Sequence, residues 1–279
     1  MKFGVAFGRL NPAFFVEATL EAERLGFESA WLPEHLVLPI EMKGSPIPGQ
    51  SHPPVPPQTP VFDAFAYLSY LAGRTSRISL GTHVYNIGLR HPFVTARAVQ
   101  TLDLVSGGRA EVGLGASWLE SEWLAAQLDF RTRGRRVDEA IAVCKRLWTE
   151  EVVEHHGEFF DFSPVSFEPK PVQKPWPPLH VGGESEAALR RAAYAGDGWL
   201  GLTHTFSSIE EPLRRLRQLR TESERPWEGF AITIQGAIEH RDDVKRWDDA
   251  GVDRMIVSPW RRSPEAIDGL RRFARLYLD

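Results

Sequence analysis

The sequence predicts an α/β fold in which one domain, residues 1–279, forms a closed (β/α)8 barrel, the TIM barrel. Two observations support this prediction: strand-like apolar runs alternate with helix-periodic segments along nearly the whole chain, and the alternation repeats eight times. Eight strand–helix pairs at this chain length match a closed parallel barrel better than an open doubly wound sheet.

Two periodicities place the individual elements. Short apolar runs bounded by turn residues indicate strands at residues 3–7, 29–32, 78–83, 110–112, 179–181, 198–201, 230–234 and 254–257. Apolar residues three or four positions apart indicate helices at residues 14–25, 61–73, 92–105, 133–149, 185–195, 208–222, 242–250 and 264–278.

The composition predicts a protein that binds a small molecule. Lys and Arg number 33 against 37 Asp and Glu, which gives no electrostatic reason to expect nucleic acid or an anionic membrane as partner. The chain begins with a strand-like segment and has no apolar run long enough for a membrane span, so we expect a cytoplasmic protein. Cys144 is the only cysteine and lies among apolar helix residues, so we expect a structural role for it.

Two connections are unusually long and rich in proline. The first, residues 38–60, is expected either to cover one side of the barrel mouth or to form a surface loop. The second, residues 150–178, is typical of a small hairpin followed by an extended lid. Both connections lie inside the strand–helix repeat, so neither is expected to link separate domains.

Residues 178–200, PLHVGGESEAALRRAAYAGDGWL, predict a strand, a diglycine turn, a helix and a second strand. Gly182 and Gly183 have no Cβ, which lets a ligand approach the backbone. Ser185 fits as the helix N-cap, so the positive end of the helix dipole faces the turn, where a phosphate would gain about 0.3 to 2 kcal/mol. The alternative is a tight strand-to-helix turn without a ligand, which is the commoner role of an isolated diglycine.

Six segments, taken together and in order, resemble the bacterial luciferase-like monooxygenase superfamily, and especially its branch of oxidoreductases that depend on the deazaflavin coenzyme F420. They are ESAWLPEH, ISLGTHVYNIGLRHP, LDLVSGGRAEVGLGASWLESEW, RGRRVDEAIAVCKRLW, PKPVQKPWPPLHVGGES and AAYAGDGW. The resemblance covers nearly the whole chain. It implies a (β/α)8 barrel that holds a flavin or deazaflavin in its C-terminal mouth, and a homodimer.

The resemblance also implies a phosphate site. Gly182, Gly183, Glu184 and Ser185 would hold the cofactor phosphate through backbone N–H groups and the serine hydroxyl. Only the backbone of Glu184 is expected to take part, because its carboxylate would repel the anion.

The cofactor ring would lie against the ends of two neighbouring strands. In related deazaflavin enzymes the segment equivalent to LGTHV carries a cis peptide bond that bulges against the ring, which here is the bond between His83 and Val84; the alternative is that His83 only closes a strand. Gly115, Ala116 and Ser117 are small residues that would let a planar ring approach the backbone.

His35 is the candidate for proton transfer, because similar enzymes place a polar or acid–base residue here and imidazole titrates near neutral pH. The alternative is a structural, hydrogen-bonded histidine next to Glu34. Trp118 stands near the position at which sugar-phosphate dehydrogenases of this branch carry a glutamate, which favours a more apolar substrate. Trp118, Trp123 and Trp199 are expected either to wall the pocket or to join the core.

The expected activity is F420-dependent hydride transfer. The alternatives are an FMN-dependent monooxygenase that uses oxygen, a barrel that binds a flavin or phosphate ligand without catalysis, and a phosphate-dependent lyase or isomerase. We expect no metal site, because the adjacent His155 and His156 would point to opposite faces of a strand.

Overall fold

The apolar runs of the sequence form the strands of the computed structural model, which describes residues 1–46, 50 and 55–278. The strands are β1 (Lys2–Ala6), β2 (Ser29–Leu32), β3 (Ser79–Thr82), β4 (Tyr85–Asn86), β5 (Ala110–Gly115), β6 (Val152–His156), β7 (Asp161–Ser166), β8 (Leu179–Gly182), β9 (Gly198–Thr203), β10 (Ala231–Gln235) and β11 (Arg254–Val257).

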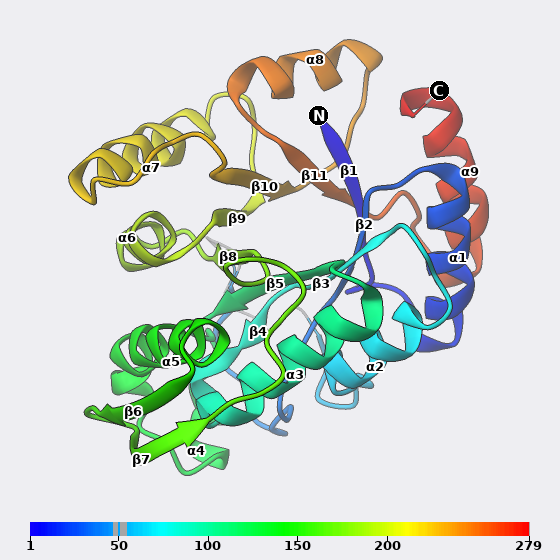
Figure 1. Cartoon of the computed structure of the whole chain (residues 1–279). Coiled ribbons are helices and arrows are strands. Elements are labelled where there is room, and N and C mark those ends of the chain that lie inside the picture. Colours follow the sequence, from blue (N-terminus) through cyan, green and yellow to red (C-terminus); the bar gives the residue numbers. More distant parts are fainter. Residues whose placement is uncertain (47–49, 51–54, 279) are drawn as a thin grey trace.

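Within the described residues, eight parallel strands close into the predicted (β/α)8 barrel (Figure 1). The order around the ring is β3, β2, β1, β11, β10, β9, β8 and β5, and β5 pairs back with β3 to complete the circle. The short strand β4 pairs with the end of β5, beyond the part of β5 that contacts β3.

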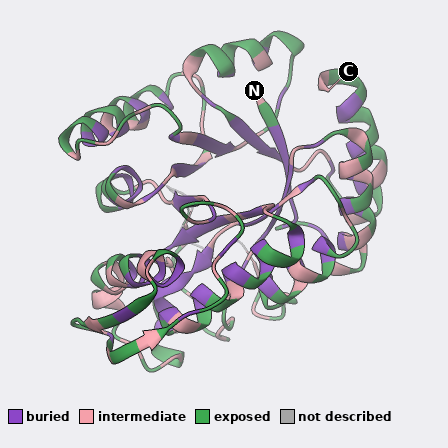
Figure 2. Ribbon diagram, viewed as in Figure 1, coloured by how far each residue is buried: buried purple, intermediate pink, exposed green. Residues whose placement is uncertain are grey.

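Helices surround the barrel, with buried residues on the side that faces the strands and exposed residues on the outer side (Figure 2). They are α1 (Phe15–Leu25), α2 (Ala64–Ala72), α3 (Pro92–Ser106), α4 (Glu120–Ala125), α5 (Arg133–Thr149), α6 (Glu186–Ala195), α7 (Glu210–Glu222), α8 (Arg241–Ala250) and α9 (Ala266–Tyr277). Cys144 lies on the buried face of α5, as expected for a residue that packs in the core, and burial raises the pKa of its thiol. No helix in the described part of the chain has the length and apolar character needed to cross a membrane.

Local hydrogen bonds explain where the elements depart from their predicted bounds. The helix expected from residue 61 begins at Ala64, because the carboxylate of Asp63 caps it by accepting the N–H of Ala66 at 2.8 Å. The strand expected to end at residue 112 continues to Gly115. Helix α4 follows it and was not predicted, because a six-residue helix shows too little periodicity.

The second long connection does not cover the barrel mouth, so the expectation of a lid there is wrong. It joins α5 to β8, and a connection from a helix to the next strand lies at the N-terminal end of a parallel barrel. Strands β6 and β7 form the expected hairpin. The proline-rich part that follows is held at the N-terminal end, where the Gln173 amide donates to Asp103 at 2.7 Å and to the carbonyl of Ala110 at 2.9 Å.

The first long connection follows β2 and therefore starts at the C-terminal end. Much of its proline-rich centre, residues 47–49 and 51–54, lies outside the described residues. Its expected role as a cover for the mouth stays a prediction.

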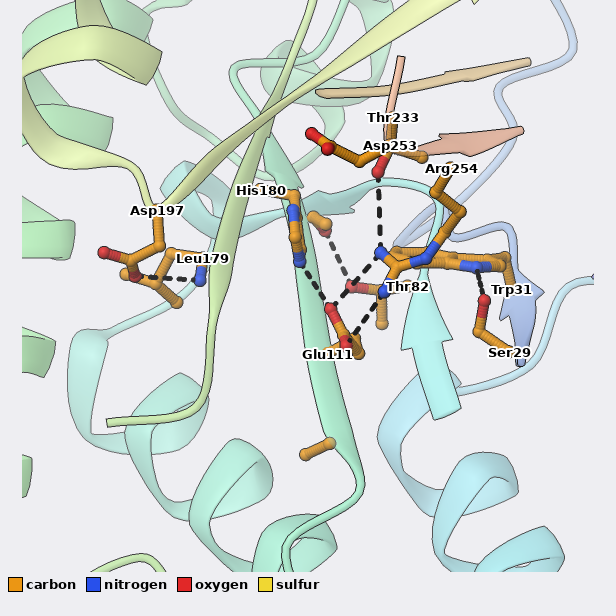
Figure 3. Close-up of polar contacts among 12 residues, drawn as sticks. Ser29, Trp31, Thr82, Glu111, Leu179, His180, Asp197, Thr233, Asp253 and Arg254 are labelled. Carbon is orange, nitrogen blue, oxygen red and sulfur yellow. Dashed lines mark hydrogen bonds and ion pairs between the residues drawn. The ribbon is translucent and has the colours of Figure 1, made fainter. Parts of the chain in front are cut away.

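Charged side chains lie at the N-terminal end of the barrel interior, and we call this group the floor network; Figure 3 shows three of its members, Glu111, His180 and Arg254. It consists of Glu28, Glu111, His180 and Arg254. Arg254 donates to Glu28 at 2.6 Å and to Glu111 at 3.1 Å, and Nε2 of His180 lies 2.5 Å from the Glu111 carboxylate. The guanidinium also lies over the ring of Trp31, 5.2 Å from its centroid. Charges enclosed by apolar strands are thus paired with one another, which offsets the cost of removing them from water.

Candidate functional site

Four neighbouring strands, β2, β3, β5 and β8, carry the predicted site residues at their C-terminal ends. His35 follows β2, Val84 follows β3, Ser117 follows β5, and the Gly182–Ser185 turn ends β8. Because the carboxyl ends of parallel strands meet at one edge, these residues lie along one side of the barrel mouth. The active sites of such barrels are built at this edge.

The peptide bond between His83 and Val84 is cis, as the resemblance implies. The side chain of Val84 packs against a small buried cluster inside the barrel that includes Trp31. A Cβ placed on Gly115 or on Gly182 would lie 2.9 Å from a methyl group of Val84. The two glycines therefore make room for the valine, and the three residues form one contiguous surface.

His83 stays attached to the barrel wall through its backbone. Its N–H donates to the carbonyl of Leu32 at 2.8 Å, which continues the pairing of β3 with β2. Burial lowers the pKa of the His83 imidazole to about 4, so the side chain is uncharged at neutral pH. A neutral ring at this place adds no charge beside a bound cofactor.

The Gly182–Ser185 turn has the features of an anion site. Gly183 has a φ of 117°, a left-handed conformation that favours glycine. The hydroxyl of Ser185 caps α6 by accepting the N–H of Ala188 at 3.3 Å, so the positive end of the helix faces the turn. Among the described residues, the backbone N–H groups of Glu184 and Ser185 have no acceptor. These free donors fit a phosphate.

The carboxylate of Glu184 points away from this turn. It accepts the N–H of Leu202 at 2.6 Å and lies 3.3 Å from Nε2 of His204. Both partners belong to the segment that ends β9, so the charge is held on the side of the neighbouring strand. This geometry agrees with the expectation that only the Glu184 backbone would meet a phosphate.

The turn also depends on a tryptophan from the neighbouring strand. The indole N–H of Trp199 donates to the carbonyl of Gly183 at 2.9 Å. Trp199 and Trp123 are both fully buried, so these two tryptophans belong to the core, whereas Trp118 is partly exposed.

His35 is anchored by a carboxylate that sequence reasoning missed. Its Nδ1 lies 3.1 Å from Oε2 of Glu122, whose side chain is fully buried at the start of α4. The other carboxylate oxygen accepts the N–H of Leu36 at 2.7 Å. The side chain of His35 keeps 16% of its surface exposed, with its ring edge-on to Trp118 at 6.0 Å.

Glu34, whose place next to His35 suggested the alternative of a structural histidine, binds other residues. Its carboxylate binds Arg90 at 2.6 Å and accepts the N–H of Asn86 at 2.9 Å. Burial raises the pKa of Glu34, while attraction to Arg90 opposes that rise. The amide of Asn86 also reaches Glu122 at 3.5 Å, so it bridges the two carboxylates.

Ser117 adopts a left-handed conformation with a φ of 63°, which is uncommon for a residue other than glycine. Its hydroxyl donates to Glu122 at 3.3 Å and accepts the N–H of Leu119 at 3.2 Å. Ala116, just before it, is only partly buried. The turn after β5 thus presents small residues to the mouth and fixes the start of α4.

The structure joins the predicted residues into two groups. Gly115 and Gly182 both lie against Val84, whereas His35 and Ser117 meet at Glu122. Glu122 was missed because a lone glutamate in the run LESEW gives no sign of which way it faces. The adjacent histidines that could have suggested a metal have separate partners: His155 contacts Glu139, and His156 contacts Asp161.

Comparisons with known proteins cover nearly the full chain. A family model described as luciferase-like monooxygenase matches residues 4–272. An uncharacterised protein of Mycobacterium tuberculosis is 29% identical over 271 residues, which are 95% of this chain and 92% of that protein. The F420-dependent glucose-6-phosphate dehydrogenase of Kineococcus radiotolerans is 30% identical over 192 residues, which are 68% of this chain and 52% of that enzyme.

Solved structures share the fold. An F420-dependent secondary alcohol dehydrogenase in complex with an F420–acetone adduct has a TM-score of 0.80 at 15% identity, covering 99% of this chain and 98% of that chain. The monooxygenase RslO1 from Streptomyces bottropensis has a TM-score of 0.77 at 22% identity, covering 100% of this chain and 99% of that one. With the family match over residues 4–272 and the closed barrel, the chain belongs to the luciferase-like monooxygenase family.

Proposed function

We propose that this protein is an oxidoreductase that transfers a hydride between coenzyme F420 and a small organic substrate. The observation that carries the proposal is His35, a partly exposed imidazole that is held by the buried carboxylate of Glu122. His35 follows β2, and the neighbouring strand β3 leads to Val84. Reduction of a carbonyl requires a proton as well as a hydride, and an anchored imidazole at the mouth is suited to exchange that proton.

The remaining site residues take separate roles in this proposal. Gly182, Gly183, Glu184 and Ser185 bind the cofactor phosphate, with the Glu184 carboxylate held aside by the end of β9. His83 and Val84 support the ring system from below, and Gly115, Ala116 and Ser117 let it approach the turn after β5. When bound, the deazaflavin supplies the hydride donor or acceptor that the side chains lack.

An apolar substrate fits the surroundings of His35 better than a sugar phosphate. Val37 and Ile40, on the loop after β2, expose 42% and 78% of their surfaces, and Trp118 lies against the His35 ring. These side chains can bury a hydrocarbon part of a substrate but cannot bind a phosphate. We therefore propose a small, weakly polar carbonyl or alcohol compound.

An FMN-dependent monooxygenase is the second candidate. Its support is the likeness in fold to RslO1 and to an FMN-bound Baeyer–Villiger monooxygenase, whose TM-score is 0.68 at 14% identity. The phosphate turn suits either cofactor. With either cofactor, we propose a cytoplasmic enzyme that acts on a small diffusible substrate. We also propose a homodimer, which a measurement of the protein's mass in solution tests.

Cofactor titration tests the proposal. The protein is titrated separately with F420 and with FMN, and binding is followed by ligand fluorescence. We expect a clear preference for F420, followed by oxidation of reduced F420 in the presence of ketones and aldehydes with apolar side chains. A preference for FMN with oxygen-dependent turnover would move the assignment to the monooxygenase, and tight binding without turnover on any carbonyl would favour the non-catalytic barrel. Absence of binding by either cofactor would revive a lyase or isomerase.

A further inference from the structure

We infer that Glu122 is a positioning residue that fixes the tautomer of His35, so that Nδ1 always carries a hydrogen and Nε2 exchanges the proton with the substrate. The identity of that substrate rests on the proposed function. The tautomer does not, because it follows from the hydrogen bonds around Glu122 in the protein alone.

The first step is the set of groups that contact Glu122. Its Oε1 accepts the N–H of Leu36 at 2.7 Å and that of Val37 at 3.4 Å. Its Oε2 faces the hydroxyl of Ser117 at 3.3 Å and the amide nitrogen of Asn86 at 3.5 Å, besides Nδ1 of His35 at 3.1 Å. Backbone and amide N–H groups can only donate, so Glu122 acts as an acceptor on both oxygens.

The second step concerns the two nitrogens of the ring. A carboxylate that accepts from all its other neighbours needs a hydrogen on the nitrogen that faces it, so neutral His35 is held with the hydrogen on Nδ1. Among the described residues, Nε2 has no hydrogen-bond partner. The lone pair of Nε2 is therefore the basic position that remains free.

The third step is the charge balance around the ring. Glu122 is the titratable side chain in contact with His35, and Asn86 connects Glu122 to the pair formed by Glu34 and Arg90. Arg90 is engaged by Glu34 at 2.6 Å, and in the described part of the chain no lysine or arginine forms an ion pair with Glu122. The buried charge of Glu122 thus has one cationic partner available, the imidazolium form of His35, which it stabilises whenever Nε2 takes up a proton.

This arrangement defines the proton step. In the reducing direction, a bound reduced deazaflavin would supply the hydride for the new C–H bond at the carbonyl carbon, and the C=O π pair would pass to the oxygen. Nε2 of the imidazolium gives its proton to that oxygen, forming the O–H bond and leaving His35 neutral with hydrogen on Nδ1. Oxidation of an alcohol is the reverse. Glu122 is fully buried, so it acts only through His35.

The direct test is nitrogen-15 NMR of the wild-type protein without cofactor, using two-bond couplings of the histidine rings and a His35→Asn variant to assign the signals. We expect neutral His35 to show a protonated Nδ1 and an unprotonated Nε2. The opposite tautomer, or an equal mixture of both, would overturn the inference whatever the protein's activity.

The kinetic test is Glu122→Gln. With its oxygen retained by the N–H of Leu36, the glutamine turns its NH2 group toward Nδ1 and favours the wrong tautomer. We expect kcat to fall about 10²- to 10³-fold while KM and the F420 dissociation constant change less than about threefold. In the reducing direction, in which His35 gives the proton, the basic limb of the kcat/KM profile should move to lower pH, because the imidazolium loses its anionic partner.

Two matched variants separate this role from a structural one. Glu120→Gln, an exposed change two residues earlier in α4, should leave kcat and the pH profile unaltered. Glu122→Gln added to His35→Asn should cost little more than His35→Asn alone, and additive losses would overturn the inference. A protein with the expected tautomer but no F420-dependent turnover would refute the proposed function and leave the role of Glu122 in place.

Discussion

Each end of the barrel holds a histidine paired with a carboxylate that has little or no exposed surface, but the two pairs differ in what else binds the carboxylate. At the floor, Glu111 contacts both His180 and Arg254. At the mouth, Glu122 contacts His35 and otherwise only neutral donors. The side chain of His180 is 3% exposed, whereas that of His35 is 16% exposed.

The difference teaches how one pair of residue types serves two purposes. At the floor, Arg254 supplies a permanent positive charge, so Glu111 has a cationic partner besides His180. At the mouth the guanidinium of Arg90 is engaged by Glu34, and the charge on Glu122 is balanced only when His35 is protonated. The carboxylate at the floor therefore always has a positively charged partner, whereas the carboxylate at the mouth gains one only when His35 takes up a proton.

The largest expected effect is at the floor. Arg254→Met removes the buried cation shared by Glu28 and Glu111 and leaves two partly buried carboxylates without it, so the free energy of unfolding should fall by about 3 to 5 kcal/mol. Urea denaturation followed by circular dichroism measures this loss. A loss below about 1 kcal/mol would show that the floor network contributes little to the stability of the fold.

The next effect separates the two histidines. His35→Asn should lower turnover with F420 about 10²- to 10⁴-fold and change the free energy of unfolding by less than about 1 kcal/mol. His180→Asn should do the reverse, costing about 1 to 3 kcal/mol of stability with turnover of the folded protein retained. Steady-state kinetics and urea denaturation of both variants test this prediction. Similar losses of turnover and of stability in the two variants would contradict the separate roles of His35 and His180.

The third effect is on pH dependence. Burial alone would raise the pKa of Glu111, but attraction to His180 and Arg254 outweighs it and lowers the pKa to about 2 from 4.5. A carboxylate with a lowered folded pKa stabilises the fold above its unfolded pKa, and that stabilisation is lost as the pH falls from about 5 to 2. The difference in unfolding free energy between wild type and Glu111→Gln should therefore shrink by about 3 kcal/mol over this range. A constant difference would contradict the assignment.

The smallest effect tests the packing at the mouth. Gly115→Ala places a methyl group 2.9 Å from Val84 and should displace that side chain, weakening F420 binding by about 1 to 2 kcal/mol, or roughly 5- to 30-fold. Gly73→Ala, whose added carbon would meet its nearest neighbour at 3.7 Å, is the control with unchanged affinity. Equal affinities of the two variants would remove Val84 from the cofactor surface.

The strand–helix alternation was sufficient to predict the barrel, because period-two and period-3.6 patterns are local properties of the chain. The position of the connection between α5 and β8 was misjudged as a lid, although the strict order of helix then strand already assigns it to the N-terminal end. Its hairpin was predicted correctly.

Local sequence patterns could not predict which side chains pair with one another. Arg254 and Glu28 are far apart in the sequence, and their pairing follows only from barrel closure between β11, β1 and β2. A weak signal existed, since Glu111 and Arg254 are charged residues within apolar strands and must find partners. For Glu122, the short helix that carries it left no periodic signal of which residue faces inward.

The bond from the Trp199 indole to the Gly183 carbonyl has an optical consequence. Indole fluorescence responds to the groups around the ring. An anion bound to the backbone N–H groups of Glu184 and Ser185 should therefore change the emission of Trp199, one of the nine tryptophans. Inorganic phosphate does not absorb at these wavelengths, so its binding could be followed by the change in tryptophan emission without a label. The Trp199→Phe variant is the control. The Gly182–Ser185 turn thus has its own spectroscopic probe for the proposed binding of phosphate.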